Sequence, residues 1–208
     1  MRLYDWNPAP NPRRVRVFAA EKGIELELVE VGDGAGLKTD FLGRSDHRTV
    51  PMLELEDGTL VGEAMAICRV LEMLHPDTPL LGTTPAQVGL IHMWEHICEL
   101  EGIIGTAEIL RNSAPPFADR ALPGRNDPVP QIPAMVERGR GRVAAFRERL
   151  DARLADCEFI AGDAFSMADI TALCGVDFGV RCRVPIPADL ENLGRWHAAV
   201  SARPSTNA

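Results

Sequence analysis

Residues 49–67 read TVPMLELEDGTLVGEAMAI, and this stretch decides the fold. Asp57-Gly58 separates two short apolar runs, which predicts a tight β-hairpin because glycine adopts the positive φ that such turns need. Gly62-Glu63-Ala64 then opens a helix. Pro51 precedes the first strand, where its missing N–H breaks no inner ladder bond, and it is a candidate for a cis peptide.

The same stretch predicts a site for a small anionic peptide. A turn at Pro51 would hold the backbone N–H and C=O of Val50 outward, where an extended ligand can pair with them. The helix that follows offers bare backbone N–H groups at its start, and such groups bind carboxylates. Glu63 at the start of this helix needs no ligand to explain it, because the helix dipole alone favours an acid at this position.

The residues before this stretch predict a mixed sheet with helices on both faces. In the first helix, Asn11 is expected as the N-cap and Pro12 as the first-turn proline. The side chain of Tyr4 is expected in the core or on the surface, outside the chemistry. The predicted elements are strands at 2–4 and 25–31, helices at 13–22 and 63–75, and a loop at 32–48 with one helical turn around Phe41-Leu42.

From residue 86 the pattern is helical to the end, which indicates a second domain. We therefore expect a domain at 1–76, a linker at 77–85 and an all-helical domain at 86–208. The segment 112–133 carries six prolines and is expected as a long loop or lid. Helices are predicted at 86–111, 134–155, 166–178 and 188–202.

The segment 159–170, FIAGDAFSMADI, predicts a helix start by local physics. Ser166 as the N-cap and Asp169 three residues later form a capping box, and Phe165 against Ile170 forms a hydrophobic staple. This motif is expected to nucleate a helix and to take no part in catalysis.

The Val-Pro pair, the Asp-Gly hairpin and the acidic helix start resemble the glutathione-binding half of glutathione transferases, and segment 159–170 resembles their C-terminal signature. The resemblance implies a thioredoxin-like N-terminal domain followed by a C-terminal helical bundle. It also implies that the Val50 backbone, next to Pro51, pairs with the cysteinyl part of glutathione. Glu63 would bind the α-amino group. Ala64 stands where the family usually has a serine, so one hydroxyl donor to the γ-glutamyl carboxylate is missing.

The catalytic position departs from the family pattern. No hydroxyl or thiol occurs between Asp5 and Pro12, and Pro10 stands where the cysteine-type bacterial enzymes have their Cys. By resemblance to the bacterial relatives that carry Asn, Asn11 would donate its amide N–H to the glutathione thiolate; the alternative is that it only caps the helix.

The same resemblance assigns three further residues to the site. Trp6 and Asn7 would face an apolar second-substrate pocket, although Trp6 serves equally well as a packing residue. Arg48 would reach the glycyl carboxylate of glutathione, or else be a solvated loop arginine.

The expected function is transfer of glutathione to a small apolar electrophile, with glutathione-dependent reduction of disulfides or peroxides as an enzymatic variant. The alternative is a non-catalytic protein of this fold that binds glutathione, apolar ligands or a protein partner. The resemblance implies a homodimer.

Composition bounds the remaining possibilities. The net charge of −8 argues against a nucleic-acid surface, and the cluster Arg13, Arg14 and Arg16 is expected as solvated surface. No apolar run approaches membrane-spanning length. Five cysteines without a secretion signal suggest free thiols in the cytoplasm. His92 and His96 are expected on a helix surface, and no metal site is predicted.

Overall fold

The structure is a computed structural model that describes residues 1–32, 37, 38, 41, 43 and 48–208. Its N-terminal part is a four-stranded sheet in the order β2-β1-β3-β4. Strand β1 pairs in parallel with β2 and antiparallel with β3, and β3 pairs antiparallel with β4. The strands are β1 Arg2–Asp5, β2 Glu27–Glu30, β3 Met52–Glu54 and β4 Leu60–Gly62.

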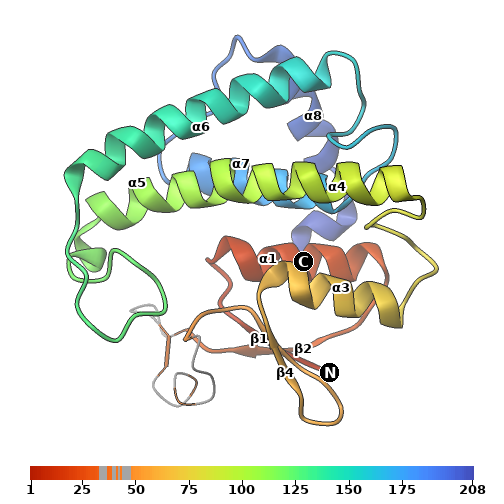
Figure 1. The fold of residues 1–208 in the computed structure, drawn as a ribbon, viewed down its shortest axis with the longest axis horizontal. Helices are drawn as coiled ribbons and strands as arrows, with labels where there is room; N and C mark the ends of the chain where they lie inside the picture. The colour runs from red at the N-terminus through yellow and green to blue at the C-terminus, as the bar shows by residue number, and fades with distance from the viewer. Residues whose placement is uncertain (33–36, 39–40, 42, 44–47) are drawn as a thin grey trace.

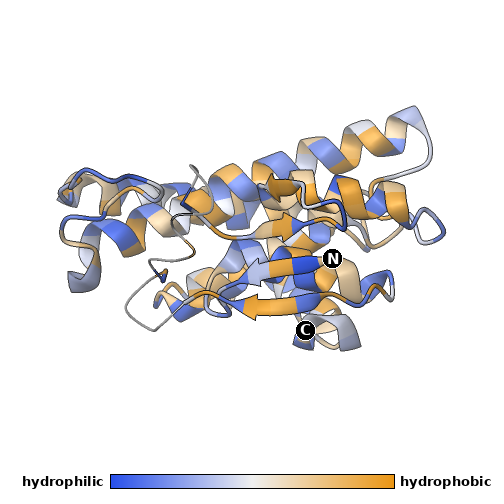
Figure 2. Cartoon of the chain, turned by 90° about the horizontal axis from the view of Figure 1, so that it is seen from below, coloured by the Kyte–Doolittle hydropathy of each residue, from blue (hydrophilic) through white to orange (hydrophobic). Residues whose placement is uncertain are grey.

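Two helices, α1 Pro10–Glu21 and α3 Ala64–Leu74, lie between this sheet and the helical part of the chain (Figure 1). Their apolar faces meet alternate strand residues, so Leu3 and Leu53 are fully buried against Phe18 and Ile67. The strands seen from below in Figure 2 accordingly carry both orange and blue segments.

The opposite face of the sheet carries a smaller cluster formed by Tyr4, Val31, Phe41 and Met52. Tyr4 is buried as expected, and its hydroxyl donates to Glu54 Oε2 at 2.5 Å. Phe41 is helical, but its expected neighbour in that turn, Leu42, lies outside the described residues. The helix predicted for this face is therefore untested beyond Phe41.

The hairpin is confirmed. The Gly58 N–H donates to the Leu55 carbonyl at 3.0 Å, and Gly58 has a φ of 84°. The side chain of Asp57 closes the turn by accepting from the Thr59 N–H at 2.9 Å.

The rest of the chain is helical, and the expected thioredoxin-like domain followed by a helical bundle is confirmed (Figure 1). Helix α7 runs through its centre, and twelve of its residues are buried. The predicted domain limits stay a prediction. The elements are α4 Pro85–Ile97, the π-helical η1 Cys98–Ile104, α5 Gly105–Ser113, α6 Pro133–Leu154, α7 Met167–Arg181, α8 Glu191–Ser201, and the short turns η2 Pro115–Phe117 and η3 Pro204–Asn207.

The loop between α5 and α6 is held down by its own side chains. Gln131 donates to the carbonyls of Arg111 and Ala114 at 2.9 and 2.8 Å. Asn112 Oδ1 accepts from the Ile132 N–H at 2.9 Å. The proline-rich segment is thus a loop, as expected, and its C-terminal end is tied back to the end of α5. None of the described helices is long and apolar enough to cross a membrane.

Candidate functional site

The strand register brings three separate segments to one end of the sheet. Tyr4 pairs with Met52, and Met52 pairs with Gly62. The segments that leave the sheet beside these residues are the loop into α1, the Val50-Pro51 turn and the start of α3. The sequence predicts the peptide site at this end of the sheet.

The Val50-Pro51 peptide is cis, as predicted. Val50 is half-buried, and the loop and turn hydrogen bonds among the described residues include none to its backbone. A backbone N–H and C=O at such a turn can pair with an extended ligand, as an edge strand does.

Glu63 is the N-cap of α3 and has a φ of 64°, a region that L-residues rarely adopt. Its side chain makes no hydrogen bond to the helix amides, so the carboxylate does not serve as a cap. Ala64, the first residue of α3, is 3% exposed. The bare N–H groups of the α3 start thus lie beside a free, exposed carboxylate.

Arg48 precedes this turn and is half-buried with a φ of 51°. Residues 44–47, which lead into it, are outside the described part of the chain. It stands two residues before Val50 in the chain.

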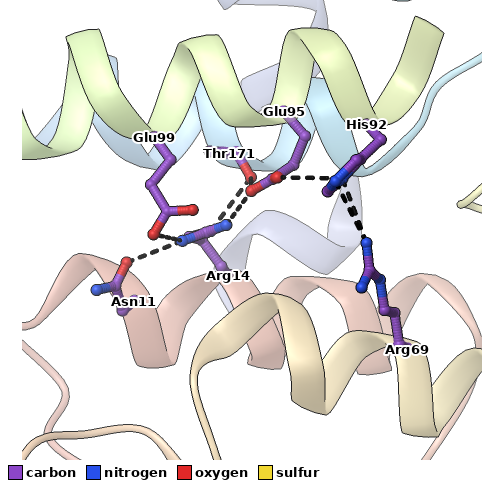
Figure 3. A network of polar contacts seen from close by, with 7 residues as sticks. All are labelled: Asn11, Arg14, Arg69, His92, Glu95, Glu99 and Thr171. Carbon is purple, nitrogen blue, oxygen red and sulfur yellow. Dashed lines mark hydrogen bonds and ion pairs between the residues drawn. The ribbon is translucent and has the colours of Figure 1, made fainter. Parts of the chain in front are cut away.

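Asn11 lies in the first turn of α1, so the prediction that it caps this helix is wrong. The helix begins at Pro10, and the N-cap is Ala9. The physical reason is that proline suits the first helical position, where a missing N–H costs no hydrogen bond. The half-buried side chain of Asn11 is instead engaged by Arg14, whose Nη1 donates to Asn11 Oδ1 at 3.0 Å (Figure 3).

The expectation that Arg13, Arg14 and Arg16 form a solvated surface is also wrong. Arg14 and Arg16 are 1% and 7% exposed. Arg16 pairs with Asp5 at 2.6 Å, and Arg13 pairs with Asp177 at 2.5 Å.

Arg14 belongs to a buried polar network that joins α1 to α4, η1 and α7 (Figure 3). Its guanidinium makes a short contact with Glu95, which is 1% exposed, and Nε donates to Thr171 Oγ1 at 3.1 Å. Glu99 lies 3.4 Å from Nη1. Burial raises the pKa of Glu95, and the charge of Arg14 opposes that rise. This network was not predicted from the sequence. The signal for it was the spacing of Glu95 and Glu99, which places two acids on one helix face and favours a basic partner.

The network extends to the surface at His92, which is exposed. His96 is exposed as well. A ring nitrogen of His92 lies 4.0 Å from Glu95, and Arg69 of α3 reaches the same ring at 3.4 Å. The described residues contain no group of three or more His, Cys, Asp or Glu side chains that could hold a metal.

The loop from β1 to α1 contains both predicted pocket residues. Trp6 packs so closely on Gly32 that a Cβ at Gly32 would come within 2.0 Å of its ring. Asn7 is exposed; its N–H donates to Glu30 at 3.3 Å, and its Oδ1 accepts from Arg16 at 3.5 Å.

A cavity of about 410 Å³ opens beside Asn7, between the start of α1, the end of α7 and the C-terminus. Most of its lining residues are polar or charged, so it differs from the apolar second-substrate pocket that Trp6 and Asn7 were expected to face. Burial raises the pKa of Asp177, but hydrogen bonds from His197 and Arg13 outweigh it and lower the pKa overall. The lining residues are Asn7, Arg13, Arg16, Asp177, Val180, Arg181, Thr206, Asn207 and Ala208.

The three fully buried thiols are poor substitutes for the missing cysteine near α1. Cys68, Cys98 and Cys174 are fully buried, and burial raises the pKa of each. A thiol with a raised pKa is a poor nucleophile at neutral pH.

Comparison with known proteins identifies relatives along the whole chain. The family model "Glutathione S-transferase, N-terminal domain" matches residues 9–74, and "Glutathione S-transferase, C-terminal domain" matches residues 116–204. Glutathione S-transferase 2 of Saccharomyces cerevisiae is 33% identical over 99% of this chain and 87% of its own length.

Solved structures agree. A glutathione S-transferase domain-containing protein of Marinobacter aquaeolei VT8 superimposes with a TM-score of 0.89 at 33% identity, covering 99% of this chain and 100% of that one. A glutathione S-transferase of Methylobacterium radiotolerans JCM 2831, solved in complex with glutathione sulfonate, has a TM-score of 0.78 at 28% identity, covering 99% and 92%.

Proposed function

The chain belongs to the glutathione S-transferase family, and from this premise we propose that it binds glutathione at the end of the sheet described above and transfers it to a small apolar electrophile. The observation that carries the proposal is the convergence of the cis Val50-Pro51 turn, the start of α3 and the start of α1. An extended tripeptide with two carboxylates and one ammonium matches the groups offered there.

Each part of glutathione has a partner of suitable chemistry. The Val50 backbone pairs with the cysteinyl unit, and the Glu63 carboxylate binds the α-amino group. The N–H groups at the start of α3 hold the γ-glutamyl carboxylate, with Ala64 contributing its backbone alone. Arg48 binds the glycyl carboxylate. The second substrate would lie beyond Trp6 and Asn7.

The chemistry requires the thiolate, because the thiolate is the nucleophile. The thiol proton passes to solvent, and the thiolate sulfur forms a bond to the electrophilic carbon while the leaving group departs with its electron pair. Asn11 stabilises the thiolate by donating an Nδ2–H, and the start of α1 adds a partial positive charge.

Replacing Asn11 by Ala will raise the pKa of the bound thiol by about one unit, because a hydrogen bond to a charged partner contributes about 1–3 kcal/mol. Titration of the thiolate absorbance in the glutathione complex measures this directly. Asn192→Ala, on distant α8, is the matched control and will leave the titration unchanged. An unaltered titration in Asn11→Ala would leave the start of α1 as the sole cause of activation.

Two observations decide between the enzyme and a non-catalytic binder. Calorimetry with glutathione tests binding, and absence of binding at millimolar concentration would exclude both transfer and glutathione-dependent reduction. Binding without thiolate formation at neutral pH would favour the non-catalytic alternative. Parallel assays with an aryl halide, a small disulfide and a hydroperoxide separate transferase from reductase activity.

We also propose a cytoplasmic homodimer that buries the groove between α3 and α4. This groove has a volume of about 240 Å³ and is lined in part by Met65, Leu81 and Val88. Val88 is 48% exposed, and Met93, also on α4, is 47% exposed.

Replacing Val88 by Asp will shift the protein from dimer to monomer in sedimentation velocity, because a charge would be desolvated at the interface. Leu122→Asp, at an apolar residue of the loop after α5 that is 56% exposed, will leave the dimer intact. A wild-type chain that sediments as a monomer would refute the homodimer.

A further inference from the structure

The amide oxygen of Asn11 accepts a hydrogen bond within the protein, whereas its amide nitrogen has no hydrogen-bond acceptor among the described residues. Arg14 Nη1 donates to Asn11 Oδ1 at 3.0 Å. A guanidinium has donors only, so this contact is favourable with the amide oxygen toward Arg14 and not with the amide nitrogen. The Nδ2 group is therefore directed away from Arg14, and its N–H groups are polarised by the cation on the other side of the amide.

Arg14 is itself held by the helical part of the chain (Figure 3). Its three nitrogens are each assigned: Nε donates to Thr171, Nη2 contacts Glu95, and Nη1 donates to Asn11. The side chain is 1% exposed, so no water competes along most of its length. The planar fork can satisfy these partners in one orientation only.

The charges around Arg14 do not make it a source of positive potential. Glu95 and Glu99 both lie against its guanidinium, while the nearby thiols of Cys68, Cys98 and Cys174 have pKa values raised by burial. One cation thus meets two acids. Any influence of Arg14 on a nearby thiolate must act through the orientation of Asn11.

We propose that Arg14 is a positioning residue for thiol activation: α4 and α7, through Glu95 and Thr171, fix its guanidinium, which in turn orients Asn11 so that Nδ2 points to the glutathione sulfur. The proposal rests on the proposed function, in which Asn11 is the thiolate donor. It makes the helical part of the chain responsible for an activity whose visible groups all lie in the first 64 residues.

The test is Arg14→Lys, which keeps the charge but not the fork. An ammonium can remain paired with Glu95, yet it cannot also hold Asn11 and Thr171 in fixed directions. We expect the pKa of the bound thiol to rise by about one unit, so kcat/KM at pH 7 falls about fivefold for a wild-type thiol that titrates near pH 7, and recovers at high pH. The KM for glutathione should change by less than about twofold, since the groups that hold its backbone are untouched.

A double variant identifies the route of the effect. If Arg14 acts through Asn11, Arg14→Lys combined with Asn11→Ala will titrate like Asn11→Ala alone. Arg147→Lys is the matched control: Arg147 is also a buried arginine, 2% exposed, but it donates to the backbone carbonyls of Val184 and Pro185. Its thiol titration should match the wild type.

The outcomes separate the inference from the function beneath it. A raised thiol pKa in Asn11→Ala together with a normal one in Arg14→Lys overturns the positioning role and leaves the proposed function standing. Normal titration in both refutes Asn11 as the donor, and the positioning role with it. If Arg14→Lys does not fold, Thr171→Val removes the acceptor of Nε at constant volume, and an unchanged titration there overturns the proposal.

Discussion

Replacing Glu95 by Ala will lower the free energy of unfolding by about 3–5 kcal/mol, because it strands the buried charge of Arg14. The side chains of Arg14 and Glu95 are 1% and 2% exposed, so neither is screened by water. Removing one member of such a pair costs more than the pair contributes. Urea denaturation followed by circular dichroism measures the change, with the slope against urea serving as the check on two-state behaviour.

The matched control is Glu101→Ala in the adjoining η1 segment. Glu101 pairs with Arg149 at 2.8 Å, but their side chains are 27% and 48% exposed, so we expect a loss of at most about 1 kcal/mol. A double variant, Arg14→Met with Glu95→Met, should be more stable than Glu95→Ala alone, since it removes both charges. A loss below about 1 kcal/mol in Glu95→Ala would mean that Glu99 compensates Arg14 by itself.

The sheet end was predictable because its signals are local. The Asp-Gly turn and the Val-Pro pair each specify a backbone conformation within four residues, and the structure has both the turn and the cis peptide. The apolar alternation of the strands then sets the register that brings Val50 and Glu63 together. No contact distant in sequence was needed for these inferences.

The errors about the buried arginines depend on partners outside their own helix. The local sequence around Arg14 predicts a surface residue. Arg14 is buried because it pairs with Glu95, which is 81 residues away in the chain. Arg16 is buried because Asp5 ends the neighbouring strand with its carboxylate inward. The misplaced N-cap at Asn11 is a local error, because Pro10 already occupies the first helical position. A buried charge cannot be recognised from the sequence of one helix alone. The free-energy cost of burying it depends on whether another element supplies an opposite charge.

Segment 159–170 gives the second large effect, since Asp169 gathers four hydrogen bonds in a fully buried position. Oδ1 accepts from the Ile160 N–H and from Trp196 Nε1, both at 3.0 Å. Oδ2 accepts from the N–H and the hydroxyl of Ser166, at 3.0 and 3.2 Å. The carboxylate arm of the expected capping box is thus confirmed, and α8 is tied to it through Trp196.

Replacing Asp169 by Ala will lower the free energy of unfolding by about 3–5 kcal/mol, because four buried donors lose their acceptor at once. Asp163, an exposed acid in the same segment, is the matched control, and Asp163→Ala should cost less than about 0.5 kcal/mol. Trp196→Phe removes one of the four bonds and should fall between the two. Equal losses in Asp169→Ala and Trp196→Phe would show that the indole contact alone carries the effect.

The same residue predicts a pH dependence whose sign is fixed by its burial. Burial raises the pKa of Asp169 to about 6, against hydrogen bonds that lower it, whereas an unfolded aspartate titrates near about 3.9. Between these values the native state binds more protons than the unfolded state, so this group's contribution to stability falls as pH rises from about 4 to 6. Asp169→Ala removes the titrating group, and its urea midpoints should decline less over that window than those of the wild type. A wild-type decline that persists unchanged in the variant would assign the dependence to other carboxylates.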